Sequence, residues 1–416
     1  MQLKRLALTQ VRVFEQAEFE FQPGMNLLVG VNGAGKSTVL DALRVMLSKA
    51  LPKLTSARSV SIHLGVDDIT VGHDWLYTVV QFDMNGVELE YEIREWREKI
   101  GAIDVKKGDV RQQIDDRRDV HRLRHREKLP KDLKNNPEQP LAIFFSTHRS
   151  LLDTRQSKAS GQAAAFANAL IDNRGLRLRE FAEWWLVQEA LANEVSDGPF
   201  AHRLDVLNDA VASFLDDCAN LRAVREPETT LMIDKDGTPL DIRQLSDGER
   251  GMVALVFDLA RRLAQANPKL ENPLRDGKAV VLIDELDLHL HPSWQRTIAQ
   301  RLTTTFPNCQ FIATTHSPQV IGEVSPENII LIEDGKTYRP NQSFGMDSNW
   351  IVQYLMGGSE RNTVIDQRLD YIGDLIEDEK FEQAAVEINQ LRDQIGDFFE
   401  LVRLQTRLDR MRIIGI

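Results

Sequence analysis

The stretch MNLLVGVNGAGKSTVL, residues 25–40, most constrains what this chain can fold into. Its apolar start MNLLV is typical of a buried strand, and the apolar residues after the glycines recur with the period of a helix. The residues that fit the pattern G-x-x-x-x-G-K-[ST] are Gly30, Gly35, Lys36 and Ser37. Glycines in this pattern let backbone N–H groups surround phosphate oxygens. The order of strand, glycine loop and helix therefore predicts an α/β fold with a phosphate site.

Each residue type in this phosphate loop (residues 30–37) predicts a contact. Lys36 would reach the β- and γ-phosphate oxygens, and Ser37 would bind Mg²⁺. The nucleotide-binding candidates are Asn32, Gly33, Ala34, Gly35, Lys36, Ser37 and Thr38. The alternative is a glycine turn before an ordinary helix. We expect ATP and Mg²⁺ as cofactors.

The segment AVVLIDELDLHLHP, residues 279–292, predicts the second half of a nucleotide site. Its apolar run is typical of a buried parallel strand, whose carboxyl end is where ligands bind in open α/β sheets. Adjacent carboxylates on a strand face opposite ways. We therefore expect Asp284 to hold the magnesium ion and Glu285 to orient or deprotonate the attacking water. The alternative is a strand that ends in solvated acids.

Two further segments carry candidate phosphate contacts. The strand-like CQFIATTHSP ends in His316, which we interpret as a γ-phosphate sensor in preference to a packed histidine. The segment QLSDGER, residues 244–250, precedes a helical pattern. Ser246 and Gly248 suit a helix N-terminus, where unpaired N–H groups and the helix dipole attract anions. The alternative there is an ordinary capped helix.

The order of these four motifs resembles the ABC ATPase superfamily, specifically its soluble branch of structural-maintenance, RecF-like and OLD-like proteins. The resemblance implies a head with a mixed β-sheet around the phosphate loop. It also implies that Ser246 and Gly248 complete the γ-phosphate site of a second subunit in a head-to-tail homodimer. Asp287 matches the loop after the catalytic acid, and Arg12 matches an arginine that contacts nucleotide, with a surface arginine as the alternative. The glutamine loop has two candidate places, Gln81 and FFSTHR.

The same resemblance divides the chain into four parts. Residues 1–150 form an ATPase lobe with a charged insertion, 151–222 a short helical lid, 223–340 the second lobe, and 341–416 a helical tail. Within 159–222 we expect helices whose core includes Trp184, Trp185 and Leu186. The lid lacks the heptads of a long coiled-coil arm. In the tail, apolar stripes on both sides of EDEK predict a helical hairpin, whose stripes serve as core or as a partner or oligomer contact.

A compact ATPase head, a short lid and the tail segment SFGMDSN resemble the PtuA-type ATPase subunits of bacterial Septu anti-phage systems. This resemblance implies an ATP-hydrolysing defence subunit whose nucleotide state controls a partner HNH nuclease. The alternatives are a RecF-like DNA-repair ATPase and, less favoured, the motor of a membrane transporter. The residues after His316 lack the acidic pattern of an intrinsic metal-dependent nuclease.

Composition limits the partners. A net charge of −12 repels nucleic acid, so DNA contact needs a local basic patch. Residues 106–134 are locally basic and would supply that patch, or form a solvated face. Cys218 and Cys309 lack paired spacing, and no apolar run is long enough for a membrane span, so we expect a cytoplasmic protein without membrane contact. His289 and His291 lack a third metal ligand nearby and favour a structural role.

Overall fold

The structure is a computed structural model that falls into two units, Met1–Ile351 and Val352–Ile416. It describes residues 1–58, 60–84, 86–98, 119–125, 138–151, 162–172, 175, 177–194, 200–226, 228–358 and 363–414. The predicted basic segment 106–134 lies outside the described residues except for 119–125. The division into two lobes, lid and tail stays a prediction, and residues 341–351 of the predicted tail belong to the first unit.

The first unit contains a six-stranded sheet in the order β14-β13-β3-β12-β11-β7. Its parallel strands are β3 (Met25–Val29), β7 (Leu141–Phe145), β11 (Ala279–Ile283), β12 (Cys309–Thr314) and β13 (Ile329–Glu333), and β14 (Lys336–Tyr338) is antiparallel to β13. Strands of a parallel sheet are covered on both faces, which explains apolar runs such as MNLLV and AVVLI. The strands β3, β12 and β11 are neighbours, so the segments that follow them meet at one edge.

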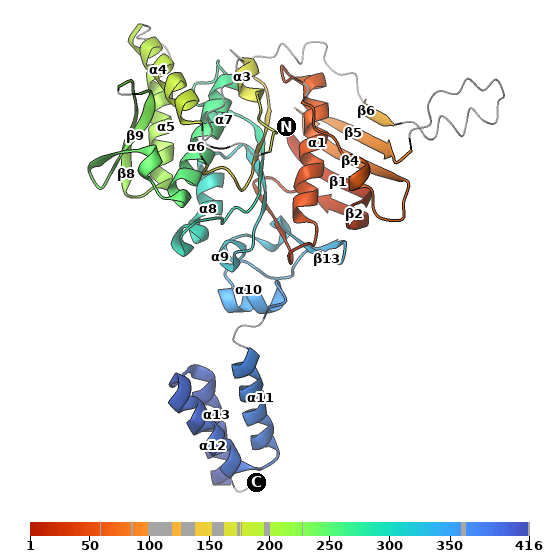
Figure 1. The fold of residues 1–416 in the computed structure, drawn as a ribbon, viewed down its shortest axis with the longest axis vertical. Coiled ribbons are helices and arrows are strands. Elements are labelled where there is room, and N and C mark those ends of the chain that lie inside the picture. The colour runs from red at the N-terminus through yellow and green to blue at the C-terminus, as the bar shows by residue number, and fades with distance from the viewer. Residues whose placement is uncertain are drawn as a thin grey trace, which may run out of the picture. The chain divides into compact units, whose positions relative to one another are not determined.

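A five-stranded antiparallel sheet lies beside α1 (Lys36–Leu54), the helix that follows the phosphate loop (Figure 1). Its order is β2-β1-β4-β5-β6, formed by β1 (Gln2–Val11), β2 (Phe14–Glu20), β4 (Trp75–Met84), β5 (Val87–Trp96) and β6 (Val120–His125). Leu40 and Leu43 of α1 share one buried cluster with Leu6 of β1 and Val80 of β4. This core fixes the position of α1 and therefore of the phosphate loop at its N-terminus.

Helices pack around the long helix α6 (Asp247–Ala266), and a third sheet packs against two of these helices, α4 (Leu178–Glu194) and α5 (Phe200–Phe214). The helices are α3 (Gln162–Phe166), α4 and α5, and the sheet contains β8 (Cys218–Val224), β9 (Thr230–Lys235) and β10 (Thr238–Asp241). Trp185 is buried and stacks on Phe257 of α6, which Trp184 meets edge-on. Leu186, predicted in this core, is only half-buried. The expected helical region also ends earlier than predicted, because β8 begins at Cys218.

Short elements connect these layers in the first unit. They are η1 (Val66–Asp68), η3 (Ile242–Gln244), α7 (Pro273–Asp276), α8 (Pro292–Thr305), α9 (Pro318–Ile321) and η4 (Pro326–Asn328), and α10 (Ser348–Tyr354) crosses the boundary between the units. His291 is the N-cap of α8, and its Nδ1 accepts a hydrogen bond from the backbone N–H of Ser293 (3.3 Å). That cap gives His291 the structural role that its spacing favoured.

The second unit is a bundle of α11 (Thr363–Glu377), α12 (Phe381–Ile395) and α13 (Phe399–Ile414). Its buried residues on α11 and α12 include Ile372, Ile376, Ile388 and Leu391, which belong to the predicted stripes. The predicted hairpin is therefore present, with EDEK at its turn. A third helix completes it, because Leu401, Leu404 and Leu408 of α13 enter the same core.

The structure gives the state of both cysteines and the character of the described helices. Cys218 and Cys309 are buried and free. Burial raises the pKa of both thiols to about 12, so they stay protonated at neutral pH. Among the residues that the structure describes, no helix combines the length and the apolar character needed to cross a membrane.

Candidate nucleotide site

The phosphate loop joins β3 to α1, and two of its glycines, Gly30 and Gly35, leave no room for a Cβ. A Cβ on Gly30 would lie 2.4 Å from the carbonyl oxygen of Ile332 in β13. Gly35 has a φ of +106°, and a Cβ there would lie 2.5 Å from the Phe14 ring. Glycine adopts such a φ without the steric cost that a side chain adds. The loop is thus shaped by close neighbours on both sides, and α1 begins directly after it with unpaired N–H groups.

Lys36 lies under the phosphate loop and close to the acidic segment after β11. Its Nζ donates hydrogen bonds to the carbonyl oxygens of Gly30 (2.8 Å) and Val31 (3.0 Å). Burial lowers the pKa of Lys36, and the charges of Asp284 and Glu285 oppose that shift. An ammonium group at the first residue of a helix suits phosphate oxygens, because its charge adds to the attraction of the helix N-terminus for anions.

Asp284 and Glu285 follow β11, which ends at Ile283, so neither residue lies on the strand. The strand alternation that the sequence suggested therefore does not apply to this pair, which lies in the backbone turn after β11. Glu285 has a φ of +48°, a left-handed conformation that non-glycine residues rarely adopt. Thr314 at the end of β12 joins the two residues, because its Oγ1 donates to Asp284 Oδ1 (2.7 Å) and accepts from the N–H of Glu285 (2.7 Å).

Asp287 and His316 meet at the same edge of the sheet. Asp287 Oδ1 accepts hydrogen bonds from the Thr315 hydroxyl and from the backbone N–H of His316 (3.3 Å). His316 is half-buried and follows β12 after Thr315. Asp287 therefore anchors the backbone that presents His316, a contact that the sequence pattern did not reveal.

Arg12 lies beside the start of α1. Its Nε donates to Asp68 Oδ1 (2.7 Å), and its NH1 donates to Asp41 Oδ2 (3.0 Å) and to Thr38 Oγ1 (3.4 Å). Burial lowers the pKa of Arg12, but the bonds to Asp68 and Asp41 outweigh it and raise the pKa overall. The structure thus places Arg12 next to Thr38, with its guanidinium held by two carboxylates.

The segment 244–250, which we call the signature segment, forms the N-terminus of α6. Ser246 is the N-cap, and its hydroxyl and backbone N–H donate to Glu249 Oε2 (2.7 and 2.8 Å). Lys235 of β9 pairs with the other oxygen of the same carboxylate. Ser246 Oγ in turn accepts the backbone N–H of Glu249 (3.4 Å), and this reciprocal arrangement is a capping box. Within one chain the segment therefore acts as an ordinary capped helix. The predicted contact with a second subunit stays a prediction.

Gly248 has a steric role within its own chain. A Cβ at Gly248 would lie 2.4 Å from the carbonyl oxygen of His289, in the loop after Glu285. We expect Gly248→Ala to lower the free energy of unfolding by about 1–3 kcal/mol, since α6 must move away from that loop. Denaturant titration of the whole protein measures the effect. Gly251→Ala is the matched control, because its Cβ would meet neighbours only at 3.8 Å or beyond. Equal stabilities would contradict the close packing.

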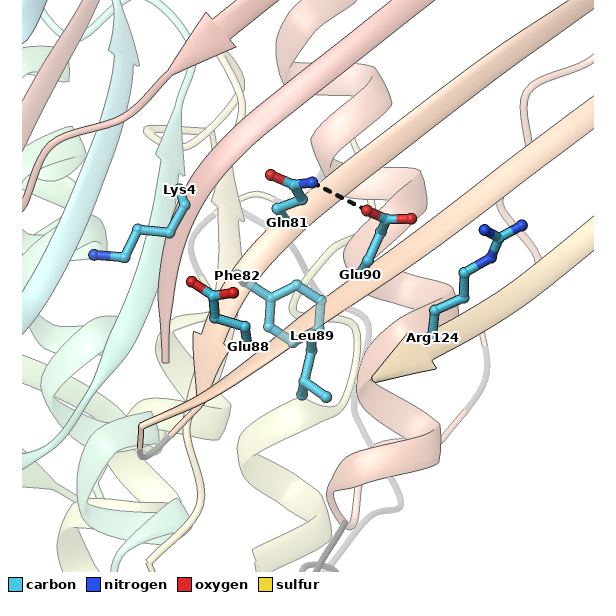
Figure 2. Close-up of a pocket in the computed structure, with 7 residues that line it drawn as sticks. All are labelled: Lys4, Gln81, Phe82, Glu88, Leu89, Glu90 and Arg124. Carbon is cyan, nitrogen blue, oxygen red and sulfur yellow. Dashed lines mark hydrogen bonds between the residues drawn. The ribbon is translucent and has the colours of Figure 1, made fainter. Parts of the chain in front are cut away.

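Neither candidate place for the glutamine loop supplies a glutamine at this edge. Gln81 lies within β4, and its Nε2 donates to Glu90 Oε2 (3.0 Å) in the pocket of Figure 2. That pocket is lined by residues of the five-stranded sheet, whereas the phosphate loop follows β3 of the six-stranded sheet. The segment FFSTHR instead follows β7, the neighbour of β11, and so ends beside Asp284.

Arg149, the last residue of FFSTHR, is a residue that sequence reasoning missed. Its guanidinium is buried and donates to the carbonyl oxygens of Asp284 (2.8 Å) and Glu285 (2.7 Å). The sequence signal for this contact is an arginine shortly after the apolar strand β7, and that pattern is not specific. The loop after β7 is therefore part of the site.

Comparisons with known proteins cover the segments that form this site. A family model described as "AAA domain, putative AbiEii toxin, Type IV TA system" matches residues 25–322. That range contains the phosphate loop, the signature segment, Asp284, Glu285 and His316. The matched region therefore includes every segment that meets at the edge described above.

Individual relatives extend beyond the family model. Retron Ec83 probable ATPase of Escherichia coli is 29% identical over 413 residues, covering 83% of this chain and 73% of that protein. Septu protein PtuA of Bacillus thuringiensis is 22% identical over 368 residues, covering 85% of this chain and 83% of that protein. Among solved structures, an Smc head bound to the C-winged helix domain of ScpA is 16% identical with a TM-score of 0.49, covering 82% of this chain and 98% of that chain.

Proposed function

The chain belongs to the AAA-domain family whose model it matches, and we propose that it is the ABC-type ATPase subunit of a bacterial anti-phage defence complex. In this proposal its nucleotide state controls the assembly or activity of a partner HNH nuclease. One observation carries the ATPase half of the proposal: the phosphate loop, Asp284, Glu285 and His316 converge at one edge of the six-stranded sheet. The similarity to PtuA over most of both chains supports the defence half.

We assign the ATP contacts to the phosphate loop and the segments beside it. Backbone N–H groups from Asn32 to Thr38 surround the phosphates, while Lys36 neutralises the β- and γ-oxygens. Ser37 and Asp284 would hold Mg²⁺, which prefers oxygen ligands such as a hydroxyl and a carboxylate. The hydroxyl of Thr314 donates to one oxygen of Asp284 and so fixes the orientation of the carboxylate, which leaves the other oxygen to bind Mg²⁺. The ion, when bound, neutralises charge on the β- and γ-phosphates.

We assign the chemistry to Glu285 and His316. Glu285 accepts a proton from the attacking water while the oxygen of that water bonds to the γ-phosphorus. The bond between the γ-phosphorus and the bridging oxygen of the β-phosphate breaks, and ADP is released. His316 binds a γ-phosphate oxygen and so reports whether that group is present. Asp287 acts through His316, because it accepts the hydrogen bond from that residue's backbone N–H. Arg12 would contact the nucleotide beside Thr38, to whose hydroxyl its guanidinium donates a hydrogen bond.

The proposed assembly is at least a head-to-tail homodimer. The N-terminus of α6 carries Ser246 and Gly248, and a helix N-terminus attracts phosphate through its N–H groups and dipole. In the dimer this end would complete the nucleotide site of the opposite subunit. DNA contact, which the basic segment 106–134 suggested, remains a further proposal.

Purification with the neighbouring gene product tests the defence assignment. We expect a complex whose mass changes between ATP and nucleotide-free conditions. An HNH nuclease beside the gene supports the Septu-type assignment. The 29% identity to a retron ATPase favours a retron as the alternative neighbour. A RecF-like repair ATPase would instead bind DNA without a dedicated nuclease partner, and absence of any co-purifying nuclease would contradict the main proposal.

Lys36→Ala is expected to weaken ATP binding by about 10- to 100-fold, since it removes a charged donor worth about 1.5–3 kcal/mol. Equilibrium binding of a fluorescent ATP analogue measures the loss. Lys49→Ala is the matched control, because Lys49 lies on the same helix and also donates to a backbone carbonyl, that of Val60 (3.2 Å). Unchanged affinity in Lys36→Ala would contradict the assignment of the phosphate loop.

A further inference from the structure

The guanidinium of Arg149 binds three consecutive carbonyl groups in the acidic segment after β11. NH1 donates to the carbonyl oxygen of Asp284 (2.8 Å), and NH2 donates to those of Glu285 (2.7 Å) and Leu286 (3.4 Å). NH1 also donates to the carbonyl oxygen of Ser146 in its own loop (3.3 Å). One side chain therefore connects the end of β7 to the whole turn that carries Glu285.

This turn needs to be held from outside. The φ of +48° at Glu285 is sterically unfavourable for a residue with a Cβ, so it persists only where neighbours impose it. Thr314 binds the N–H of Glu285 from β12, and Arg149 binds its carbonyl oxygen from the loop after β7. The backbone of Glu285 is thus fixed on both sides by segments that are distant in the sequence.

The loop that carries Arg149 is itself fixed. The carbonyl oxygen of Phe145 accepts the N–H of Asp284 (2.9 Å), and the carbonyl oxygen of Ser150 accepts Nε of Arg250 in α6 (3.3 Å). The guanidinium of Arg149 is buried, and the carbonyl groups that it binds lie within hydrogen-bond distance of it.

We propose that Arg149 is a positioning residue for ATP hydrolysis: its guanidinium holds the left-handed turn that directs the Glu285 carboxylate toward the attacking water. Arg149 does not touch the nucleotide in this role. It acts through Glu285, so the inference rests on the proposed role of Glu285 as the base. Sterically unfavourable backbone conformations concentrate at active sites, which agrees with this assignment.

The test is Arg149→Lys, which keeps a positive charge but cannot reach several carbonyl groups in one plane. We expect kcat to fall about 100-fold, since a shift of about 1 Å in a reacting group costs that much, with the Kd for Mg-ATP changed less than about twofold. Arg203→Lys is the matched control. Arg203 is also buried and donates to backbone carbonyls, those of Pro268 (2.6 Å) and Leu270 (3.1 Å). Its replacement should leave kcat near the wild-type value.

A double substitution separates positioning from general destabilisation. If Arg149 acts through Glu285, adding Arg149→Lys to Glu285→Gln should lower kcat by less than about threefold more, because the base that Arg149 positions is already absent. Losses that multiply in full would overturn the proposal, and so would an unchanged kcat or a Kd that weakens in parallel with kcat. Undiminished turnover in Glu285→Gln alone would instead refute the role of Glu285, independently of the Arg149 result.

Folding is monitored in each variant by circular dichroism. Where Arg149→Lys fails to fold, Arg149→Gln replaces it under the same criteria, because its neutral amide still offers two N–H donors to the carbonyl groups. Loss of the folded state in both variants would assign Arg149 to the stability of the fold and overturn the proposal.

Discussion

Glu285→Gln is expected to keep Mg-ATP binding and to lower steady-state turnover by about 10²- to 10⁴-fold, the usual contribution of a positioned general base. The amide keeps the size of the side chain but cannot accept the proton of the attacking water. Glutamine also carries a Cβ, so the strain of the left-handed φ at this position is the same in both proteins. Backbone strain therefore contributes little to the difference in turnover between the two proteins, which comes mainly from the loss of the general base.

Phosphate release and equilibrium binding of an ATP analogue together measure this effect. Glu90→Gln is a suitable control, since Glu90 lies on the five-stranded sheet and pairs with Gln81 there. It should hydrolyse ATP at the wild-type rate. Hydrolysis by Glu285→Gln at that same rate would remove Glu285 from the mechanism.

Ser246→Arg is expected to abolish hydrolysis while each subunit still binds ATP through its own Lys36 and Ser37. The bulky side chain would block closure of the dimer on the opposite nucleotide. Ser246 is also the N-cap of α6, so its replacement costs about 1 kcal/mol in helix stability. Ser246→Ala loses the same cap without the bulk, and the two variants should therefore have similar melting temperatures.

Mixing Ser246→Arg with Lys36→Ala tests the trans arrangement directly. A mixed dimer has one nucleotide site with an intact phosphate loop and an intact opposing signature segment. After subunit exchange at equal concentrations, about a quarter of the wild-type rate should return if sites act independently. Both variants are assayed alone and mixed. An inactive mixture, in which mass measurement verifies the mixed dimers, would contradict a signature segment that serves the opposite subunit.

The sequence predicts those parts of the site that depend on local spacing. The phosphate loop and the Asp284–Glu285 pair each lie in one short segment that directly follows a buried strand, so their sequence patterns can be recognised without the fold. The order of the motifs also correctly indicated the family of folds and the similarity to PtuA. The higher identity to a retron ATPase was not anticipated.

Long-range backbone contacts explain what the sequence could not predict. Arg149 binds carbonyl oxygens of Asp284 and Glu285, and carbonyl groups are the same in every residue, so no side-chain pattern records the contact. The left-handed turn at Glu285 is likewise imposed by Thr314 and Arg149 from other segments. The strand β8 was missed because its residues do not alternate between buried and exposed.

The helical bundle of residues 363–414 has a consequence for any calorimetric measurement. Its core of Ile372, Ile388, Leu401 and neighbouring residues forms a separate cluster within its own unit. Two cores that unfold independently give two heat-absorption peaks, and a single midpoint fitted to the whole chain then mixes their enthalpies. In that case a substitution in the unit Met1–Ile351 shifts one peak only. The bundle's peak, unchanged between variants, provides an internal standard for protein concentration and scan quality in the same sample cell.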